Sequence, residues 1–357
     1  MKSNYDILGN HIRLIDTRNR ESITDRVLGI NIDKFFMPSV ANVIGTDLSK
    51  YKLITKGKFA CNPMHVGRDE RLPVALYDEE EPAIVSPAYF MFEVVDNSIL
   101  NEDYLMMWFR RPEFDRICWL HTDGSVRGGI TWDDICRLEL PIPPIEKQLE
   151  IVNSYKAITE RIDGSSIVND NLDDTAQTLY QKYFESNSDK SSWKQGTVGD
   201  VLQLQRGHDL PRTEMTGGKY PVAGSTGTIG YHDEFTAEAP VIVMGRSGNI
   251  GNPRLYLCNC WTHNTSLYVK QIYEAEPLWV FYLLKNLNYD GFVGGSAVPT
   301  LNRNDVHAYG IAIPPLELQK FFSQKVMSLI YCKEENLSEI EKLQELQKII
   351  LTTMSSR

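Results

Sequence analysis

The chain has 357 residues, of which 42% are hydrophobic and 24% charged, and its formal net charge is −10 at pH 7. This length accommodates two domains of ordinary size, and the composition excludes a fibrous or disordered protein. The N-terminal residues lack the apolar run of a secretory signal, and the chain has no stretch of the roughly 18 apolar residues that cross a membrane. Its scattered cysteines form no disulfide framework, so we expect a cytoplasmic protein with reduced thiols.

The negative charge is spread unevenly along the chain. Residues 1–144 carry 17 basic and 22 acidic side chains, and residues 145–189 carry 4 and 9. Residues 190–315 balance at 10 and 10, and residues 316–357 at 6 and 6. Because no segment is a basic tail, any nucleic-acid binding has to use local basic clusters and help from a partner.

The first part of the sequence predicts a mixed α/β domain. The stretches KFACNP (58–63) and AIVSPAYFMFEVV (83–95) each predict a strand, because they are rich in apolar, β-branched and aromatic residues. EDYLMMWFRR (102–111) predicts a buried helix.

A long helix is predicted after the stretch LPIPPIEKQLEIV (140–152). Proline disfavours the α conformation in the residue before it and is well tolerated at the first turn of a helix, so Pro-Pro ends an extended segment and begins a helix. The stretch DGSS (163–166) predicts a kink or short break, since Gly164 costs about 1 kcal/mol relative to alanine. The polar stretch SNSDKSSWKQG (186–196) predicts a joint between domains.

The second part repeats this order. YPVAGSTGTIGYHDEF (220–235), APVIVMGRSGNIG (239–251) and TSLYVKQ (265–271) predict strands bounded by Gly, Asn and Ser turns, and PLWVFYLLKNL (277–287) predicts a buried helix. IAIPPLELQKFFS (311–323) then begins a second long helix.

An internal duplication underlies this order. Residues 123–148 align with residues 294–319 at a constant shift of 171 positions, and the alignment includes both Pro-Pro pairs and the glutamines Gln148 and Gln319. Matches of this density in the same order indicate a repeated unit.

Both predicted long helices carry an apolar stripe. Core packing explains such a stripe in one helix, whereas two helices of the same pattern after two similar domains favour a paired helical spacer. The residues that we expect to form the spacer or to contact partners are Ile145, Leu149, Val152, Leu172, Leu179, Val326, Ile330, Leu337, Ile340 and Leu346.

The sequence offers no complete catalytic motif. CNPM (61–64) lacks the second proline and the aromatic residue of the adenine-methyltransferase loop, and GGKY (217–220) lacks the remaining residues of a P-loop. CNC (258–260) has no second Cys/His pair at zinc-finger spacing. We therefore expect a binding protein without catalytic residues, metal or cofactor.

Glycine-rich polar loops are the candidate DNA-binding elements. Their Arg, Asn, Ser, Thr and His side chains suit base edges and phosphates, and glycine allows the backbone to approach a duplex. The candidate residues are Asn62, His65, Arg68, Arg71, Ser125, Arg127, Arg206, Arg212, Ser225, Thr226, Arg246, Ser247, Asn249, His263, Asn264, Thr300, Asn302 and Arg303.

These motifs together resemble the specificity subunit of type I restriction–modification systems. The paired Pro-Pro-x-x-x-Gln motifs, the stretches at 220–235 and 239–251, and YKLITKGKFACNPMHVGRD (51–69) carry the resemblance. It implies a mixed α/β fold with two target-recognition domains in pseudo-two-fold repeat, separated by two long antiparallel coiled-coil helices. The expected segments are a first recognition domain (1–144), a first spacer helix and joint (145–189), a second recognition domain (190–315) and a second spacer helix (316–357).

The resemblance also implies a non-catalytic subunit that recognises DNA. Each domain would read one half of a bipartite double-stranded site, and the helices would set the spacing and dock two methyltransferase subunits. S-adenosylmethionine, Mg and ATP would belong to partner subunits, among them restriction or translocase subunits where these are present. Two alternatives stay open: a protein-interaction scaffold without DNA binding, and an orphan or anti-restriction decoy.

Overall fold

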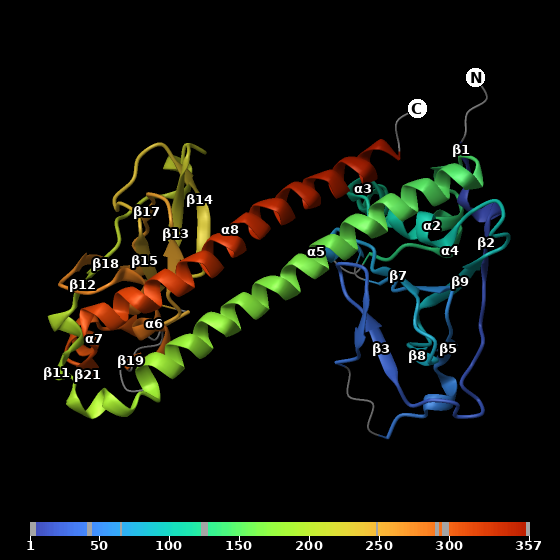
Figure 1. Ribbon diagram of the computed structural model, residues 1–357. Helices are drawn as coiled ribbons and strands as arrows, with labels where there is room; N and C mark the ends of the chain where they lie inside the picture. The colour runs from blue at the N-terminus through green and yellow to red at the C-terminus, as the bar shows by residue number, and fades with distance from the viewer. Residues whose placement is uncertain are drawn as a thin grey trace. The chain divides into compact units, whose positions relative to one another are not determined.

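The computed structural model describes residues 5–40, 45–64, 66–122, 128–247, 249–289, 293–294 and 300–354 (Figure 1). The chain divides into two compact units, which we call unit 1 (residues 1–164 and 339–357) and unit 2 (residues 165–338). Two long helices, α5 (Ile145–Tyr180) and α8 (Leu316–Thr353), each contribute residues to both units.

Unit 1 is a mixed α/β domain. Its strands are β1 (Tyr5–Ile7), β2 (Ile12–Leu14), β3 (Val27–Ile30), β4 (Phe36–Pro38), β5 (Lys52–Ile54), β6 (Lys58–Cys61), β7 (Val74–Tyr77), β8 (Ala83–Val85), β9 (Phe90–Val94) and β10 (Glu139–Pro141). Its helices besides the long ones are η1 (Leu8–Asn10), η2 (Leu48–Lys50), α1 (Val66–Asp69), α2 (Glu102–Phe109), α3 (Pro112–Leu120) and α4 (Trp132–Cys136). The strands form a sheet of order β2-β9-β6-β7, a sheet of order β4-β3-β8-β5 and the pair β1-β10.

Unit 2 has the same kind of architecture. Its strands are β11 (Lys194–Thr197), β12 (Leu202–Arg206), β13 (Tyr220–Gly224), β14 (Gly227–His232), β15 (Val241–Gly245), β16 (Arg254–Tyr256), β17 (Trp261–Thr262), β18 (Ser266–Ile272), β19 (Val293–Gly294), β20 (Thr300–Leu301) and β21 (Gly310–Ile313). Its helices besides the long ones are η3 (Gln181–Glu185), η4 (Ser188–Ser192), η5 (Val198–Asp200), η6 (Arg212–Glu214), α6 (Pro277–Asn286) and α7 (Arg303–His307). The sheet orders are β12-β18-β15-β16 and β14-β13-β17, with the pairs β11-β21 and β19-β20.

The two units repeat one topology. The sheet β2-β9-β6-β7 of unit 1 corresponds to β12-β18-β15-β16 of unit 2, and all neighbours in both sheets are antiparallel. Leu8 N donates to Leu138 O at 2.7 Å, and Val198 N donates to Tyr309 O at 2.9 Å, so the two acceptors are again 171 positions apart. The duplication seen in the sequence is therefore a duplication of structure.

One strand prediction is wrong. The stretch 83–95 forms two strands, β8 and β9, which belong to different sheets. Between them the chain turns, with Tyr89 N donating to Ser86 O at 3.1 Å and Ala88 N donating to the Ser86 hydroxyl at 3.2 Å. Pro87 has no N–H for a sheet and has the φ angle of a turn, which explains the interruption.

Aromatic side chains fill the core of each unit. In unit 1 the rings of Phe59 and Phe92 stack with centroids 5.0 Å apart, and Phe109 from α2 meets Phe59 edge-on at 5.8 Å. In unit 2 fully buried Trp279 of α6 lies 6.4 Å from the ring of Phe184. Full burial of such a side chain contributes roughly 1.5–3 kcal/mol.

The long helices α5 and α8 run antiparallel (Figure 1). In unit 1, Arg161 pairs with Glu339 at 3.0 Å and Gln347 donates to Thr159 at 2.7 Å. In unit 2, Lys333 pairs with Asp173 at 2.5 Å and Asn336 donates to Asn169 at 2.9 Å. Within the part of the chain that the structure describes, no helix is both long and apolar enough to span a membrane.

The predicted break at residues 163–166 is wrong, because α5 continues through Gly164 without interruption. The propensity cost of one glycine is small compared with the packing of residues on either side. Val152 and Ala176 on α5 are 3% and 1% exposed, and Ser165, next to the glycine, is 7% exposed. Tertiary contacts of this kind override local propensity.

Candidate nucleic-acid interface

Three polar loops of unit 2 meet through their backbones. Arg246 N donates to Thr265 O at 3.1 Å, and Leu301 N donates to Arg246 O at 2.8 Å. Ser247 and Thr300 form an isolated bridge. The predicted residues Arg246, Ser247 and Thr300 therefore lie beside one another, although more than fifty positions separate the loops in sequence.

A second group of predicted residues forms around Asp209. The Arg206 guanidinium lies 3.8 Å from the Asp209 carboxylate and donates to Asn264 O at 3.4 Å, and the Asn264 side chain donates to Asp209. Gly207 is required for this approach, because a Cβ at Gly207 would lie 2.1 Å from His263 O. The exposed Arg206 is thus held at the surface by the Asp209 carboxylate and by Asn264 O.

Two predicted contact residues have a local structural role. One ring nitrogen of His263 lies 3.0 Å from the Thr265 hydroxyl, and the other lies 3.2 Å from Leu210 O. Asn302 caps α7 by accepting a hydrogen bond from Asn304 N at 3.0 Å. These side chains shape the loops on which the exposed residues lie.

The remaining candidates of unit 2 divide by exposure. Asn249 donates to Ser225 O at 3.3 Å, which brings these two loops together. Gly245 makes room for this turn, because a Cβ there would lie 1.7 Å from Asn249 O. Exposed side chains among the unit 2 candidates are those of Arg206, Arg212, Thr226, Asn302 and Arg303.

Fewer of the unit 1 candidates can be described. The Asn62 side chain accepts from Met64 N at 3.1 Å, a turn that directly follows β6, and Arg71 pairs with Asp33 at 2.8 Å. Arg68 lies in α1, and its side chain is outside the description. His65, Ser125 and Arg127 lie outside the described residues.

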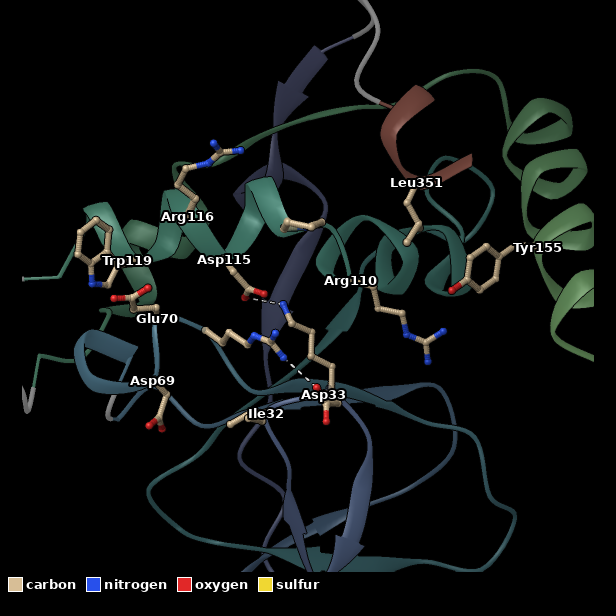
Figure 2. A pocket seen from close by; sticks show the side chains of 13 residues that line it. Ile32, Asp33, Asp69, Glu70, Arg110, Asp115, Arg116, Trp119, Tyr155 and Leu351 are labelled. Carbon is tan, nitrogen blue, oxygen red and sulfur yellow. Dashed lines mark hydrogen bonds and ion pairs between the residues drawn. The ribbon is translucent and has the colours of Figure 1, made fainter. Parts of the chain in front are cut away.

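A cavity of about 700 Å³ lies next to Arg71 in unit 1 (Figure 2). Figure 2 shows Trp119 and Arg116 of α3 at one end and Tyr155 of α5 at the other. Trp119 is 41% exposed, which is unusual for tryptophan. The sequence analysis did not predict α3, which carries Arg116 and Trp119; the signal for it was Pro112, which occupies the first position of the helix.

A buried ion pair holds this side of unit 1 together. Lys34 is 4% exposed and donates to Asp115 at 2.7 Å and to Phe109 O at 2.5 Å. Burial lowers the pKa of Lys34, and the negative charge of Asp115 opposes this effect. Asp115 also accepts from Leu72 N at 3.0 Å, so the pair connects the β3–β4 turn to α3 and to the segment that carries Arg71.

The CNC stretch holds one exposed and one buried cysteine, Cys258 and Cys260. Burial raises the pKa of Cys260 to about 12 and also raises the pKa of Cys258. Among the described residues, no group of three His, Cys, Asp or Glu side chains is arranged to hold a metal ion.

The helix residues predicted for the spacer fall into three classes. Exposed side chains are Leu149, Leu337 and Leu346. Buried side chains are Val152, Val326 and Ile340, which belong to the helix contacts or to the cores. Ile145, Leu172, Leu179 and Ile330 are half-buried.

Comparisons with known proteins place this geometry in context. Residues 190–349 match the family model of the type I restriction modification DNA specificity domain. A Methanocaldococcus jannaschii protein, provisionally named type I restriction enzyme MjaX specificity subunit, is 21% identical over 396 residues, which cover 98% of this chain and 88% of that protein.

Two solved structures share the fold. The S subunit of a type I restriction–modification system from M. genitalium matches with a TM-score of 0.63 at 16% identity, over 100% of this chain and 97% of that chain. A structure described as showing complex assembly and conformational transition of the type I R-M system matches with a TM-score of 0.50 at 16% identity, over 98% and 96%. Residues 190–349 therefore resemble the type I restriction modification DNA specificity domain, and the similarity of the chain to type I specificity subunits, expected from its motifs, is confirmed.

Proposed function

We propose that this chain is the DNA sequence-recognition subunit of a type I restriction–modification complex. Each unit reads one half of a bipartite double-stranded site, and α5 and α8 set the spacing of the half-sites. The chain supplies no catalytic residue of its own; it directs the methyltransferase subunits, and a restriction subunit where one is present.

One observation carries this proposal: the loops that bear the polar residues are built twice in the same way. In unit 1, Ile130 N donates to Pro63 O at 3.1 Å, and in unit 2, Leu301 N donates to Arg246 O at 2.8 Å. Each donor stands directly before the residue that caps a short helix, Thr131 for α4 and Asn302 for α7. Two equivalent loop sets on one chain fit two half-sites of one DNA.

The side chains on these loops suit readout of bases. Arginine can bond to guanine through two hydrogen bonds, asparagine to adenine, and serine or threonine to either base or phosphate. Arg206, Arg246 and Arg303 offer the charged groups in unit 2, and Arg68 and Arg71 offer them in unit 1. Base contacts of this kind are worth about 1–3 kcal/mol each.

The partners follow from the charge of the chain. The chain has 37 Lys and Arg side chains against 47 Asp and Glu, so its overall charge repels phosphate, and the methyltransferase subunits supply most phosphate contacts. S-adenosylmethionine, Mg and ATP bind to the partner subunits. Leu149, Leu337 and Leu346 are exposed apolar residues on which two methyltransferase subunits can dock.

Mapping of adenine methylation in the host genome, with and without this gene, tests the proposal. We expect one bipartite N6-methyladenine motif to disappear on deletion and to return on complementation. Complementation with Arg246→Ala is expected to lose discrimination by about 1–3 kcal/mol at one base of one half-site.

Arg161→Ala serves as the control, because Arg161 is 63% exposed and lies on α5, outside the loops. An unchanged methylation pattern on deletion contradicts the proposal and favours a scaffold or a decoy. Retrieval of methyltransferase subunits by the chain then distinguishes those two alternatives.

A further inference from the structure

The two glutamines of the Pro-Pro-x-x-x-Gln motifs are almost completely buried. Gln148 is 0% exposed and Gln319 is 1% exposed. A buried carboxamide needs partners for its oxygen and its nitrogen, since an unsatisfied polar group in a protein interior is unfavourable. Both glutamines lie in the first turns of the long helices, directly after the Pro-Pro pairs.

In unit 1, Gln148 joins α5 to the start of α2. Its Oε1 accepts from Asn101 N at 2.9 Å, and its Nε2 donates to Ile99 O at 2.8 Å and to Pro143 O at 2.7 Å. Asn101 is the N-cap of α2, and its own side chain accepts from Tyr104 N at 3.0 Å. One carboxamide thus connects the N-terminal ends of two helices.

Unit 2 repeats this arrangement with different neighbours. Gln319 Oε1 accepts from Glu276 N at 2.9 Å, and its Nε2 donates to Pro314 O at 2.9 Å. Glu276 is the N-cap of α6, the helix equivalent to α2. The capping residue differs between the units, Asn101 against Glu276, but in both units the glutamine accepts from the cap amide and donates to the carbonyl of the first proline of the Pro-Pro pair. We call each set of contacts the glutamine clasp of its unit.

The clasp requires a carboxamide. A glutamate would place a buried negative charge against the carbonyl oxygens that now accept from Nε2. A methionine of similar length would leave the N–H of the α2 or α6 cap without a partner. Each Pro-Pro pair fixes where the helix begins, and each clasp fixes how that helix is held against the α2 or α6 of its own unit.

We propose that Gln148 and Gln319 are positioning residues that fix the direction in which each long helix leaves its unit, and so determine which gap between half-sites the protein accepts. This inference rests on the proposed function. Neither glutamine needs to touch DNA, because the clasp acts through the helix. Loosening either clasp should therefore relax the gap and leave the bases of each half-site unchanged.

The test uses the complex of the full chain with its methyltransferase subunits. Plasmids carry the wild-type half-sites separated by the native gap or by gaps one or two bases longer or shorter, and adenine methylation is read by sequencing. The variants are Gln148→Met, Gln319→Met and Gln148→Glu. Gln324→Met, at an exposed glutamine of the same helix α8, is the matched control.

We expect the wild type and Gln324→Met to methylate sites with one gap length only. The clasp variants should methylate sites with a neighbouring gap length about tenfold more than the wild type does, because each variant loses a buried hydrogen bond. Hydrogen exchange at the amides of Asn101 and Glu276 should become faster in the corresponding Met variant. This second readout reports on the clasp even if a variant methylates poorly.

Two outcomes of the methylation assay would overturn the inference: an unchanged gap preference in folded variants, or an equal loss of methylation at every gap, which is the mark of a purely structural role. Unchanged amide exchange in both Met variants would also overturn it. A wild-type chain that directs no bipartite methylation would instead overturn the proposed function, and the gap rule with it.

Discussion

Lys34 is a buried cation that depends on a single carboxylate. Replacing it with methionine leaves Asp115 buried without its partner, so we expect Lys34→Met to lower the free energy of unfolding by about 3–5 kcal/mol. Urea denaturation measures this loss. Arg71→Ala is the control: it removes the exposed Arg71–Asp33 pair at 2.8 Å and should change the free energy by less than about 1 kcal/mol. Equal effects of the two substitutions would contradict the role given to the buried pair.

His307 makes unit 2 sensitive to acid. Leu204 N donates to His307 Nε2 at 2.8 Å, which requires a neutral ring. Burial, and then the nearby charge of Arg303, lowers the pKa of His307 from its ordinary value of 6.5. The unfolded chain therefore binds the proton more tightly than the folded chain does. The contribution of His307 to stability is complete above pH 6.5, and it is lost as the pH falls below 6.5 towards the lower folded-state pKa.

Melting temperatures of the wild type and His307→Gln across this pH range test the effect. The glutamine side chain can accept from the same amide but does not titrate, so its melting temperature should fall less between neutral and mildly acidic pH. The difference between the two curves removes the contribution of the other histidines. Parallel curves would show that the hydrogen bond to Leu204 does not control the titration.

Two features at the residue scale could not be read from the sequence. Lys34 and Asp115 are 81 positions apart, and neither stands in a motif, so only the fold brings them together. His263 was predicted as a DNA contact from its polar loop, but both its ring nitrogens face groups of unit 2. A single sequence shows which side chains lie on a loop, and it does not show which of them the loop needs for its own shape.

At the scale of elements, α5 shows how packing outweighs propensity. A Cβ added at Gly164 would meet nothing within 4 Å, and the residue is exposed within a continuous helix. We therefore expect Gly164→Ala to raise the free energy of unfolding by about 0.5–1 kcal/mol, because alanine has the higher helix propensity. Circular dichroism during urea denaturation measures the change. A destabilised variant would show that the helix needs the freedom of glycine at this position.

The starts of the long helices were easier to predict than their interiors. Pro-Pro marks a local steric event, and α5 and α8 begin at Ile145 and Leu316, directly after it. Continuity across Gly164 depends on contacts with α8, such as Asn169 with Asn336, which are 167 positions apart. Pro87 is a local signal for the turn between β8 and β9, but the apolar residues on both sides of it suggested one continuous strand.

At the scale of the whole molecule, the duplication is not exact. α3, with exposed Arg116 and Trp119, follows α2 in unit 1. In the described part of unit 2, α6 is followed instead by residues 287–289 and by the short strands β19 and β20. Two units that share one four-stranded sheet and differ in their loops suit the recognition of two different half-sites, because the sheet holds the loops while the loops carry the contacts.

The overall charge leads to a prediction about salt. Since the chain carries a formal net charge of −10, it can neutralise few phosphates by itself, and binding that depends on few phosphates weakens little with salt. The logarithm of the association constant for a bipartite duplex should fall with a slope of about −2 for the chain alone and of about −6 or steeper for its complex with methyltransferase subunits. Fluorescence anisotropy between about 50 and 200 mM salt measures both slopes.

A duplex with one scrambled half-site is the control, because it removes base contacts and leaves the phosphates in place. If the chain alone showed the steep slope, the phosphate contacts would belong to its own loops, and Arg68, Arg71, Arg206 and Arg303 would be assigned to the backbone rather than to the bases.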